Sequence, residues 1–188
     1  LTGSYDSSNR IWTFPRGTYD INNLQVAGGQ QVIFEGGSVL NINGNITSTG
    51  SGLTIGNGGD DIELNIRGDI NVSGGSRLNI GDGTIRILGR LNATSNTTIG
   101  DGRHYFGQID SGAALIVGDG DTDINGKLAV GGGHSATFGD GAFAISTGFG
   151  TDAITANGAA RLEFGDGPFA VNGNITLGGS STIIFGAT

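Results

Sequence analysis

The chain has 188 residues, of which 39 are glycine and two are proline, with no cysteine and a formal net charge of −8 at pH 7. The absence of cysteine excludes a disulfide framework, and the acidic balance argues against a nucleic-acid surface and against adhesion to anionic lipid. The glycines alternate with Ile, Leu, Val and Phe, which excludes a collagen-like helix and a flexible linker. The sequence contains no run of 18 apolar residues, which is the length that would predict a membrane-spanning helix.

The first 23 residues differ from the rest of the chain. They contain the only tryptophan, Trp12, together with Tyr5, Phe14 and Tyr19. Terminal repeats of stacked-repeat proteins are atypical, because an open end exposes strand edges and core. We therefore expect residues 1–23 to be an N-terminal capping segment, with an aromatic lid, and residues 24–188 to be a single repeat domain.

From residue 34 onward one phrase recurs, an apolar residue followed by a glycine turn, and five of its copies read apolar-Gly-Asp-Gly. The apolar anchors are Phe34, Ile55, Ile80, Ile99, Val117, Phe138, Phe164 and Phe185. A second pair of apolar anchors recurs between them, as in Ile42/Ile46, Ile66/Ile70 and Leu88/Leu91. Self-similarity at a period of about 20 residues is the signature of a stacked repeat.

The segments around each turn alternate apolar and polar residues, as in residues 84–87, which is the pattern of short strands. One such unit cannot bury its apolar face alone, but stacked copies share a core. We predict an all-β fold, a parallel β-solenoid of the right-handed β-helix kind with about 7–8 coils of ~21 residues, whose anchors form one interior column. The alternative is an antiparallel β-sandwich, which gives no reason for one turn phrase to return at the same phase.

The glycine-punctuated repeat, as in residues 40–47 (LNINGNIT), resembles the β-helical passenger regions of bacterial autotransporters and filamentous-haemagglutinin-type adhesins. The resemblance covers the chain from Thr18 onward and lies in the style of the repeat. It implies a secreted or surface-displayed scaffold without enzymatic activity. Pectate-lyase-like enzymes share this fold, and a fold does not determine function.

The aspartates of the repeated turn are expected to stack along one edge of the solenoid. They are Asp82, Asp101, Asp119, Asp140 and Asp166. We expect each to cap its own turn by accepting a hydrogen bond from a backbone N–H, because Asn57 occupies the equivalent position without a charge. The alternative is Ca²⁺ bridging between coils.

Asp119, Asp121 and Asp123 alternate along the chain and are the candidate Ca²⁺ ligands, since they could point to one side of a strand. The segment begins like an EF-hand loop, but Ile124 and Val130 replace its glycine and its terminal glutamate. The acids of residues 60–63 form a weaker second cluster, and for both segments a solvated turn is the simpler interpretation.

An enzymatic function is not predicted. Cleavage of a glycoside needs two carboxylates at a fixed separation, whereas these acids lie in glycine-flanked turns. His104 and His134 are thirty residues apart and are not expected to form a metal pair or a triad. The alternative is a carbohydrate-binding or carbohydrate-cleaving β-helix with a cleft in the longer coils, residues 56–80 and 138–164, where Phe143 and Phe149 either stack on sugars or pack in the core.

The sequence thus favours an extracellular or cell-surface structural or adhesive module, part of a surface protein or of a filament. Residues 183–188 stop within the repeat phrase, so we expect either that the chain was cut there or that something else covers its last coil. Its expected partner is either a second copy, in end-to-end self-association, or the rest of a longer surface protein, because exposed coil edges readily add strands. Glycans are a further candidate partner.

Overall fold

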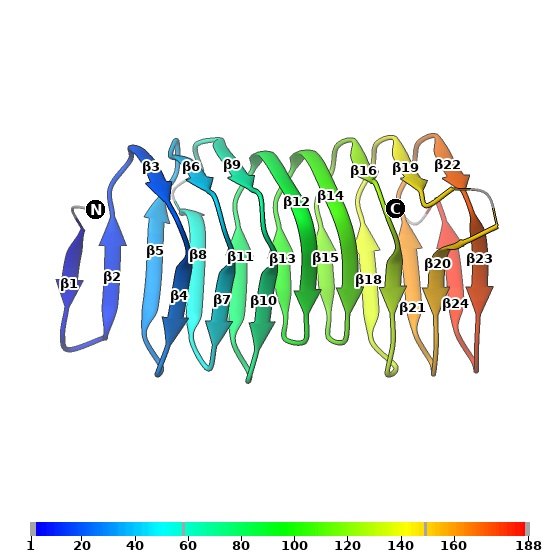
Figure 1. The fold of residues 1–188 in the computed structure, drawn as a ribbon, viewed down its shortest axis with the longest axis horizontal. Coiled ribbons are helices and arrows are strands. Elements are labelled where there is room, and N and C mark those ends of the chain that lie inside the picture. The colour runs from blue at the N-terminus through cyan, green and yellow to red at the C-terminus, as the bar shows by residue number, and fades with distance from the viewer. Residues whose placement is uncertain (1–2, 58, 149, 187–188) are drawn as a thin grey trace.

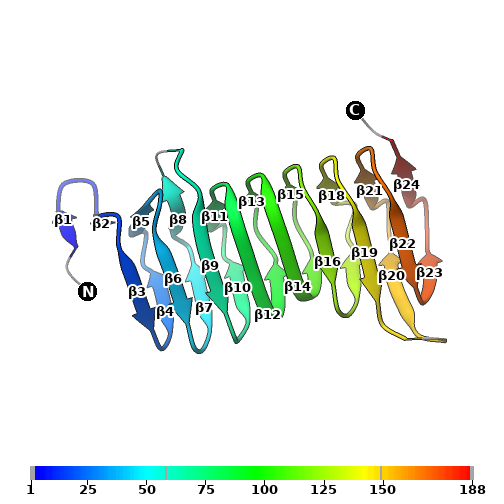
Figure 2. The same ribbon diagram turned by 90° about the horizontal axis from the view of Figure 1, so that it is seen from above.

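The computed structural model describes residues 3–57, 59–148 and 150–186, and within them the chain forms 24 strands and no helix. The strands stack as a parallel β-solenoid of about 8 turns with ~21 residues per turn (Figures 1 and 2). The predicted fold class is therefore confirmed, and the antiparallel sandwich is excluded. No helix in the described part of the chain could span a membrane.

Each coil has three sides, which we number in chain order. The first side consists of β2 (Ile11–Phe14), β5 (Gln31–Glu35), β8 (Gly52–Asn57), β11 (Arg77–Ile80), β13 (Thr97–Ile99), β15 (Leu115–Val117), β18 (Ser135–Phe138), β21 (Arg161–Phe164) and β24 (Thr182–Phe185), preceded by β1 (Ser4–Asp6). The second side consists of β3 (Thr18–Ile21), β6 (Val39–Ile42), β9 (Ile62–Ile66), β16 (Thr122–Ile124), β19 (Phe143–Ser146) and β22 (Phe169–Asn172). The third side consists of β4 (Leu24–Ala27), β7 (Ile46–Thr49), β10 (Ile70–Ser73), β17 (Leu128–Val130), β20 (Asp152–Ala156) and β23 (Asn174–Leu177). The long strands β12 (Gly83–Ala93) and β14 (Gly102–Ser111) run through both the second and the third side.

The apolar anchors of the repeat lie in one column, as predicted. Phe34 pairs with Ile55, and the same register continues coil by coil to Phe164 and Phe185. All of these side chains up to Phe164 are buried. Because side chains along these strands alternate inward and outward, this register places the anchors from Phe34 to Phe164 in a continuous core.

The second row of anchors is confirmed with one exception. Ile42 pairs with Ile66, but Ile66 pairs with the buried Ile87, whereas Leu88 is 44% exposed. The prediction that Leu88 is the anchor was wrong. The corner after Ile87 contains one more residue than the corresponding corner of the next coil. This extra residue is the register shift between β12 and β14.

The N-terminal end is closed by an antiparallel strand. β1 pairs with β2 in the opposite direction to every other pair, and Tyr5 stacks on Trp12 with ring centroids 4.7 Å apart. β2, β3 and β4 already form the first coil, so the solenoid begins before the predicted boundary at residues 23 and 24. Phe14 and Trp12 are part of this first coil, and Phe14 stacks on Phe34 of the second coil at 4.8 Å, whereas Tyr5 covers the first coil by stacking on Trp12.

Candidate functional site

The corner between the first and second sides carries a ladder of aspartates, which we call the aspartate ladder. Oδ1 of Asp101 accepts a hydrogen bond from the backbone N–H of Asp119 at 2.8 Å, and Oδ1 of Asp119 accepts one from Asp140 at 2.8 Å. The bonds from Asp101 to Asp82 and from Asp166 to Asp140 repeat this geometry. Four of the five carboxylates, those of Asp82, Asp101, Asp119 and Asp140, therefore cap the next coil and not their own turn as predicted, because stacking brings that N–H within reach.

The two glycines of each Gly-Asp-Gly turn follow from the same stacking. A Cβ on Gly118 would overlap Oδ1 of Asp101 in the preceding coil. Gly120 has a φ of +122°, and a Cβ there would overlap the carbonyl of Gly102. The first glycine leaves room for the carboxylate below it, and the second allows a backbone conformation that other residues rarely adopt.

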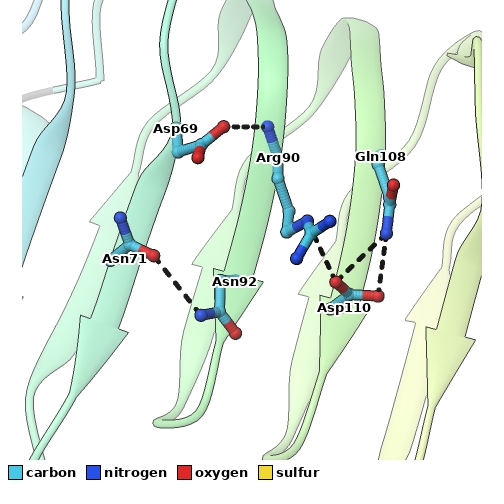
Figure 3. A network of polar contacts seen from close by, with 6 residues as sticks. All are labelled: Asp69, Asn71, Arg90, Asn92, Gln108 and Asp110. Carbon is cyan, nitrogen blue, oxygen red and sulfur yellow. Dashed lines mark hydrogen bonds and ion pairs between the residues drawn. The ribbon is translucent and has the colours of Figure 1, made fainter.

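The corner between the second and third sides has a shorter ladder that the sequence analysis missed. Oδ1 of Asn23 accepts from the N–H of Asn45, and Oδ1 of Asn45 accepts from that of Asp69, each at 2.8 Å. Oδ1 of Asp69 accepts from the N–H of Arg90, also at 2.8 Å (Figure 3). The signal that could have found it is the Asn or Asp directly before the second anchor of each pair. In both ladders, the side-chain oxygen of an Asp or Asn in one coil accepts a hydrogen bond from a backbone N–H of the next coil.

Outward side chains extend the second ladder onto the third side. Arg90 forms an ion pair with Asp110 at 3.1 Å, and Gln108 donates to the same carboxylate (Figure 3). Asn92 donates to Asn71 at 3.3 Å. These groups are partly exposed, so the contacts order the surface and add little to stability.

The three candidate Ca²⁺ ligands are engaged with three different partners. Asp119 belongs to the aspartate ladder, Asp121 accepts from the N–H of Ala142 at 3.1 Å, and Asp123 lies 4.0 Å from Arg103. Only Asp123 lies in a strand, so the three do not line one side of a strand. Among the described residues, no group of three His, Cys, Asp or Glu side chains is arranged to hold a metal ion.

The weaker acidic cluster is also dispersed. Asp60 pairs with Arg16 at 3.5 Å, and Glu63 accepts from Asn65 at 2.9 Å. Asp61 lies along a shallow hollow with Asp82 and is exposed. The geometry thus brings neither predicted cluster together as a set of ligands.

His104 lies inside the solenoid and is fully buried. Its Nε2 is 2.9 Å from the carbonyl oxygen of Gly100, and its Nδ1 is 3.2 Å from the hydroxyl of Thr122. Since a carbonyl only accepts, the neutral ring carries its proton on Nε2 and accepts from Thr122 on Nδ1. Burial lowers the pKa of His104 below 6.5, partly opposed by the Gly100 bond and by Asp101. His134 lies on an exposed turn, so the two histidines do not form a site.

A polar groove of about 800 Å³ follows the corner between the third side and the next first side. It crosses successive turns of the solenoid, from Gly29 to His134. Its polar lining includes Gln31, Thr54, Arg77, Asn79, Asn96 and His134, and no Phe, Tyr or Trp from the described residues. The groove could hold a hydroxyl-rich ligand, but it offers no ring on which a sugar would stack.

The cleft predicted from the two longer coils does not form. The extra residues of the first long coil lie between β8 and β9, and those of the second lie between β19 and β20. These connections leave the solenoid at different corners, four coils apart (Figure 2). Phe143 is 6% exposed and stacks on Phe169 in the core, and Phe149 lies outside the described residues.

The last described coil exposes apolar side chains. Phe185 stacks on Phe164 with centroids 5.6 Å apart, and Phe169 meets Phe185 edge-on at 4.7 Å. Phe185, Leu177 and Ile175 are 54%, 48% and 44% exposed, although their register places them over core positions of the preceding coil. A hollow of about 440 Å³ opens among the phenylalanines of this end. We call the surface formed by β22, β23 and β24 the C-terminal end face (Figure 1).

Comparison with protein-family models, with curated proteins and with solved structures finds no match to this chain. Function is therefore argued from geometry. Of the three features above, the ladders are internal to the fold, the polar groove is an exposed cleft, and the C-terminal end face is an apolar surface without a cover among the described residues.

Proposed function

We propose that this protein is a non-enzymatic structural or adhesive β-solenoid module of an extracellular or cell-surface protein or filament. Its mechanism is passive: a rigid, acidic rod that docks through its C-terminal end face. The fold supports this proposal, because one core and two ladders tie every coil to the next. With about 8 turns spaced by roughly 4.8 Å, the rod is on the order of 40 Å long.

The observation that carries the proposal is the apolar surface that the last described coil exposes. Phe164 is 3% exposed beneath the last coil, whereas Phe185, at the same register, is 54% exposed. Among the described residues, β22, β23 and β24 each pair with a strand on one side only, and a strand edge without a partner can bind an added strand by β-augmentation. An apolar face with open edges is suited to protein association and not to binding a small polar ligand.

The proposal is tested by light scattering and negative-stain microscopy of the purified chain over a concentration series. We expect association that Phe185→Asp abolishes. The matched control is Ile116→Asp, because Ile116 is 49% exposed in the middle of the first side and should leave association unchanged. A wild-type chain that remains a monomer at every concentration would overturn docking through this face.

A second candidate function, carbohydrate binding, is favoured by the polar groove. Gln31, Asn79 and Asn96 offer amide groups that match sugar hydroxyls, and Arg77 adds a cation. Titration with neutral and acidic oligosaccharides, followed by an assay for new reducing ends, separates binding from cleavage. Binding that Arg77→Ala weakens, in a chain that does not associate, would favour this function over the structural one.

A further inference from the structure

We infer that the second side of the solenoid holds a binding site for a short oligosaccharide with a carboxylate on the unit at one end. This inference goes beyond docking through the C-terminal end face, because it concerns a different surface of the rod. It rests on a hollow of about 420 Å³ that the first four coils form on this side. The side chains that carry the argument are those of Asp20, Asn41, Asn65, Arg67, Arg86 and Leu88, all of which line the hollow.

One row of outward side chains follows the rod axis along the hollow. Asp20 pairs with Asn41, and Asn41 pairs with Asn65. Asn65 pairs with Arg86, so the row crosses β3, β6, β9 and β12 (Figure 2). Successive members are one coil apart, roughly 4.8 Å, whereas an extended peptide repeats the side chains of one face every roughly 6.6 Å. A peptide along the row would therefore lose register, but a pyranose unit in a chain advances by about one coil spacing.

The row leaves both hydrogen-bond donors and acceptors unused. Nδ2 of Asn41 donates to Oδ1 of Asp20 at 2.9 Å, and Nδ2 of Asn65 donates to Oδ1 of Asn41 at 3.1 Å. Nδ2 of Asn65 also donates to Glu63 at 2.9 Å. Among the described residues, Oδ2 of Asp20, Oδ1 of Asn65 and the second N–H of Asn41 have no partner. A sugar hydroxyl both donates and accepts, so it matches this mixed set of groups.

Two arginines supply positive charge toward the end of the row away from Asp20. Arg67 and Arg86 are exposed, and neither forms an ion pair with a described carboxylate, whereas four other arginines do. The chain has a net charge of −8, so two uncompensated guanidinium groups in one hollow indicate an anionic ligand. A guanidinium binds a carboxylate through two parallel N–H···O bonds, which identifies the anionic group as a carboxylate.

Tyr105 holds the Arg86 side chain in place. The guanidinium carbon of Arg86 lies 4.8 Å from the centroid of the Tyr105 ring, within the range of a cation–π contact. Stacking occupies one flat face of the guanidinium and leaves its N–H edges free for a carboxylate. Leu88, which is 44% exposed at the same hollow, offers an apolar contact to the C–H groups of a sugar ring. The leucine that departs from the anchor column therefore has a place in the site.

The charges also determine which acidic sugar fits. Asp20 and Arg86 are at opposite ends of the row, three coil spacings or roughly 14 Å apart. A chain with a carboxylate on every unit would place one of them beside Asp20, where the two negative charges repel each other. A neutral chain with a single carboxylate, on the unit at Arg86, avoids this repulsion. The ligand class is therefore a mostly neutral oligosaccharide with one acidic end.

The test is isothermal titration calorimetry of the purified chain. The probes are sialyllactose, which has one carboxylate at its end, neutral lactose, and trigalacturonate, which has a carboxylate on every unit. We expect sialyllactose to bind most tightly. Arg86→Gln should weaken this binding by about tenfold or more, because it removes charge-assisted hydrogen bonds to the carboxylate. The matched control is Arg77→Gln, which removes an exposed arginine of the polar groove and should leave the binding unchanged.

A second variant tests the charge pattern. Asp20→Asn removes the negative charge at the far end of the row but keeps an oxygen that accepts from Asn41. We expect it to raise the affinity for trigalacturonate and to leave the affinity for sialyllactose unchanged. Asp20 and Arg86 are both exposed, so the melting temperatures of the variants should match that of the wild type. An Asp20→Asn chain that discriminates between the two acidic probes as the wild type does would contradict the proposed orientation of the ligand.

The remaining outcomes overturn the inference in distinguishable ways. Equal binding of lactose and sialyllactose, or wild-type binding by Arg86→Gln, would remove the role of the carboxylate. Loss of binding in Arg77→Gln alone would assign the sugar to the polar groove. Binding of none of the probes would overturn the site on the second side but not association through the C-terminal end face, which light scattering measures separately.

Discussion

The clearest test of the ladder geometry is the substitution Gly118→Ala. A Cβ at this position would overlap Oδ1 of Asp101, and it would lie 2.8 Å from the carbonyl carbon of Gly100 and 2.9 Å from the backbone nitrogen of Asp101. The carboxylate could rotate away, but it would then lose its bond to the N–H of Asp119. The two backbone atoms could not move without shifting a coil.

The magnitude follows from these two costs. Losing a charge-assisted hydrogen bond at an exposed corner costs about 1 kcal/mol, and overpacking against backbone costs about 1–3 kcal/mol. We expect a total of about 2–4 kcal/mol, which in a protein of this size lowers the melting temperature by roughly 5–15 °C. The variant should still fold, because the interior column is unchanged.

The matched control is Gly131→Ala, where nothing lies within 4 Å of an added Cβ and φ is not in the left-handed region. A glycine of this kind is neutral or slightly stabilising as alanine, by about 0.4–1 kcal/mol. The assay is thermal unfolding followed by circular dichroism or calorimetry. If Gly118→Ala melts within a degree of Gly131→Ala, the steric account of the Gly-Asp-Gly turn is refuted.

Four further outcomes are expected. Phe138→Asp buries a charge in the interior column and should abolish cooperative unfolding, so a normal melt would contradict the core described above. Ser48→Ala removes a buried hydroxyl that has no hydrogen-bond partner among the described residues, and it should raise stability by about 1 kcal/mol, measured by urea unfolding. The lowered pKa of His104 means that the unfolded chain binds more protons than the folded chain, so the contribution of neutral His104 to stability is complete above pH 6.5 and is lost as the pH falls below that value. Between pH 7.5 and pH 5.5, the melting temperature of His104→Leu should therefore fall less than that of the wild type. Equal falls in the two proteins would rule this out. Because the acids of residues 119–123 face separate partners, a chelator should leave the melt unchanged, whereas a drop of several degrees would assign Ca²⁺ to them.

The anchor column could be predicted from the sequence because, in a stacked repeat, the core residues recur at the same position of each repeat. The exception at Leu88 shows the limit of that rule. Ile87 and Leu88 are adjacent and both apolar, so periodicity alone does not decide which one points inward. Pairing with Ile66 decides it, and pairing is a property of two coils together.

The partner of each corner aspartate could not be predicted for a related reason. An Asp between two glycines is equally suited to a bond within its own turn and to one with the next coil. The same residue type serves both, and only the stacking brings the N–H of Asp119 within 2.8 Å of Asp101. The number of residues in a coil shows that the coil contains an insertion, but it does not show at which corner the insertion lies. A shared cleft was therefore predicted for two insertions that the structure places at different corners.

These constraints also decide where a binding function could evolve in this protein. At the first corner, the preceding coil fixes both glycines and the following coil fixes the aspartate, so these positions are committed to the fold. The outward positions of the first side carry no such constraint: Thr54, Asn79, Thr98 and Ile116 follow one another in a single register. Their chemistry changes from coil to coil while the inward neighbours stay apolar, because the outward side chains meet only solvent and each other. Recognition of any partner along the rod would therefore depend on the side chains in these outward columns and in the polar groove beside them.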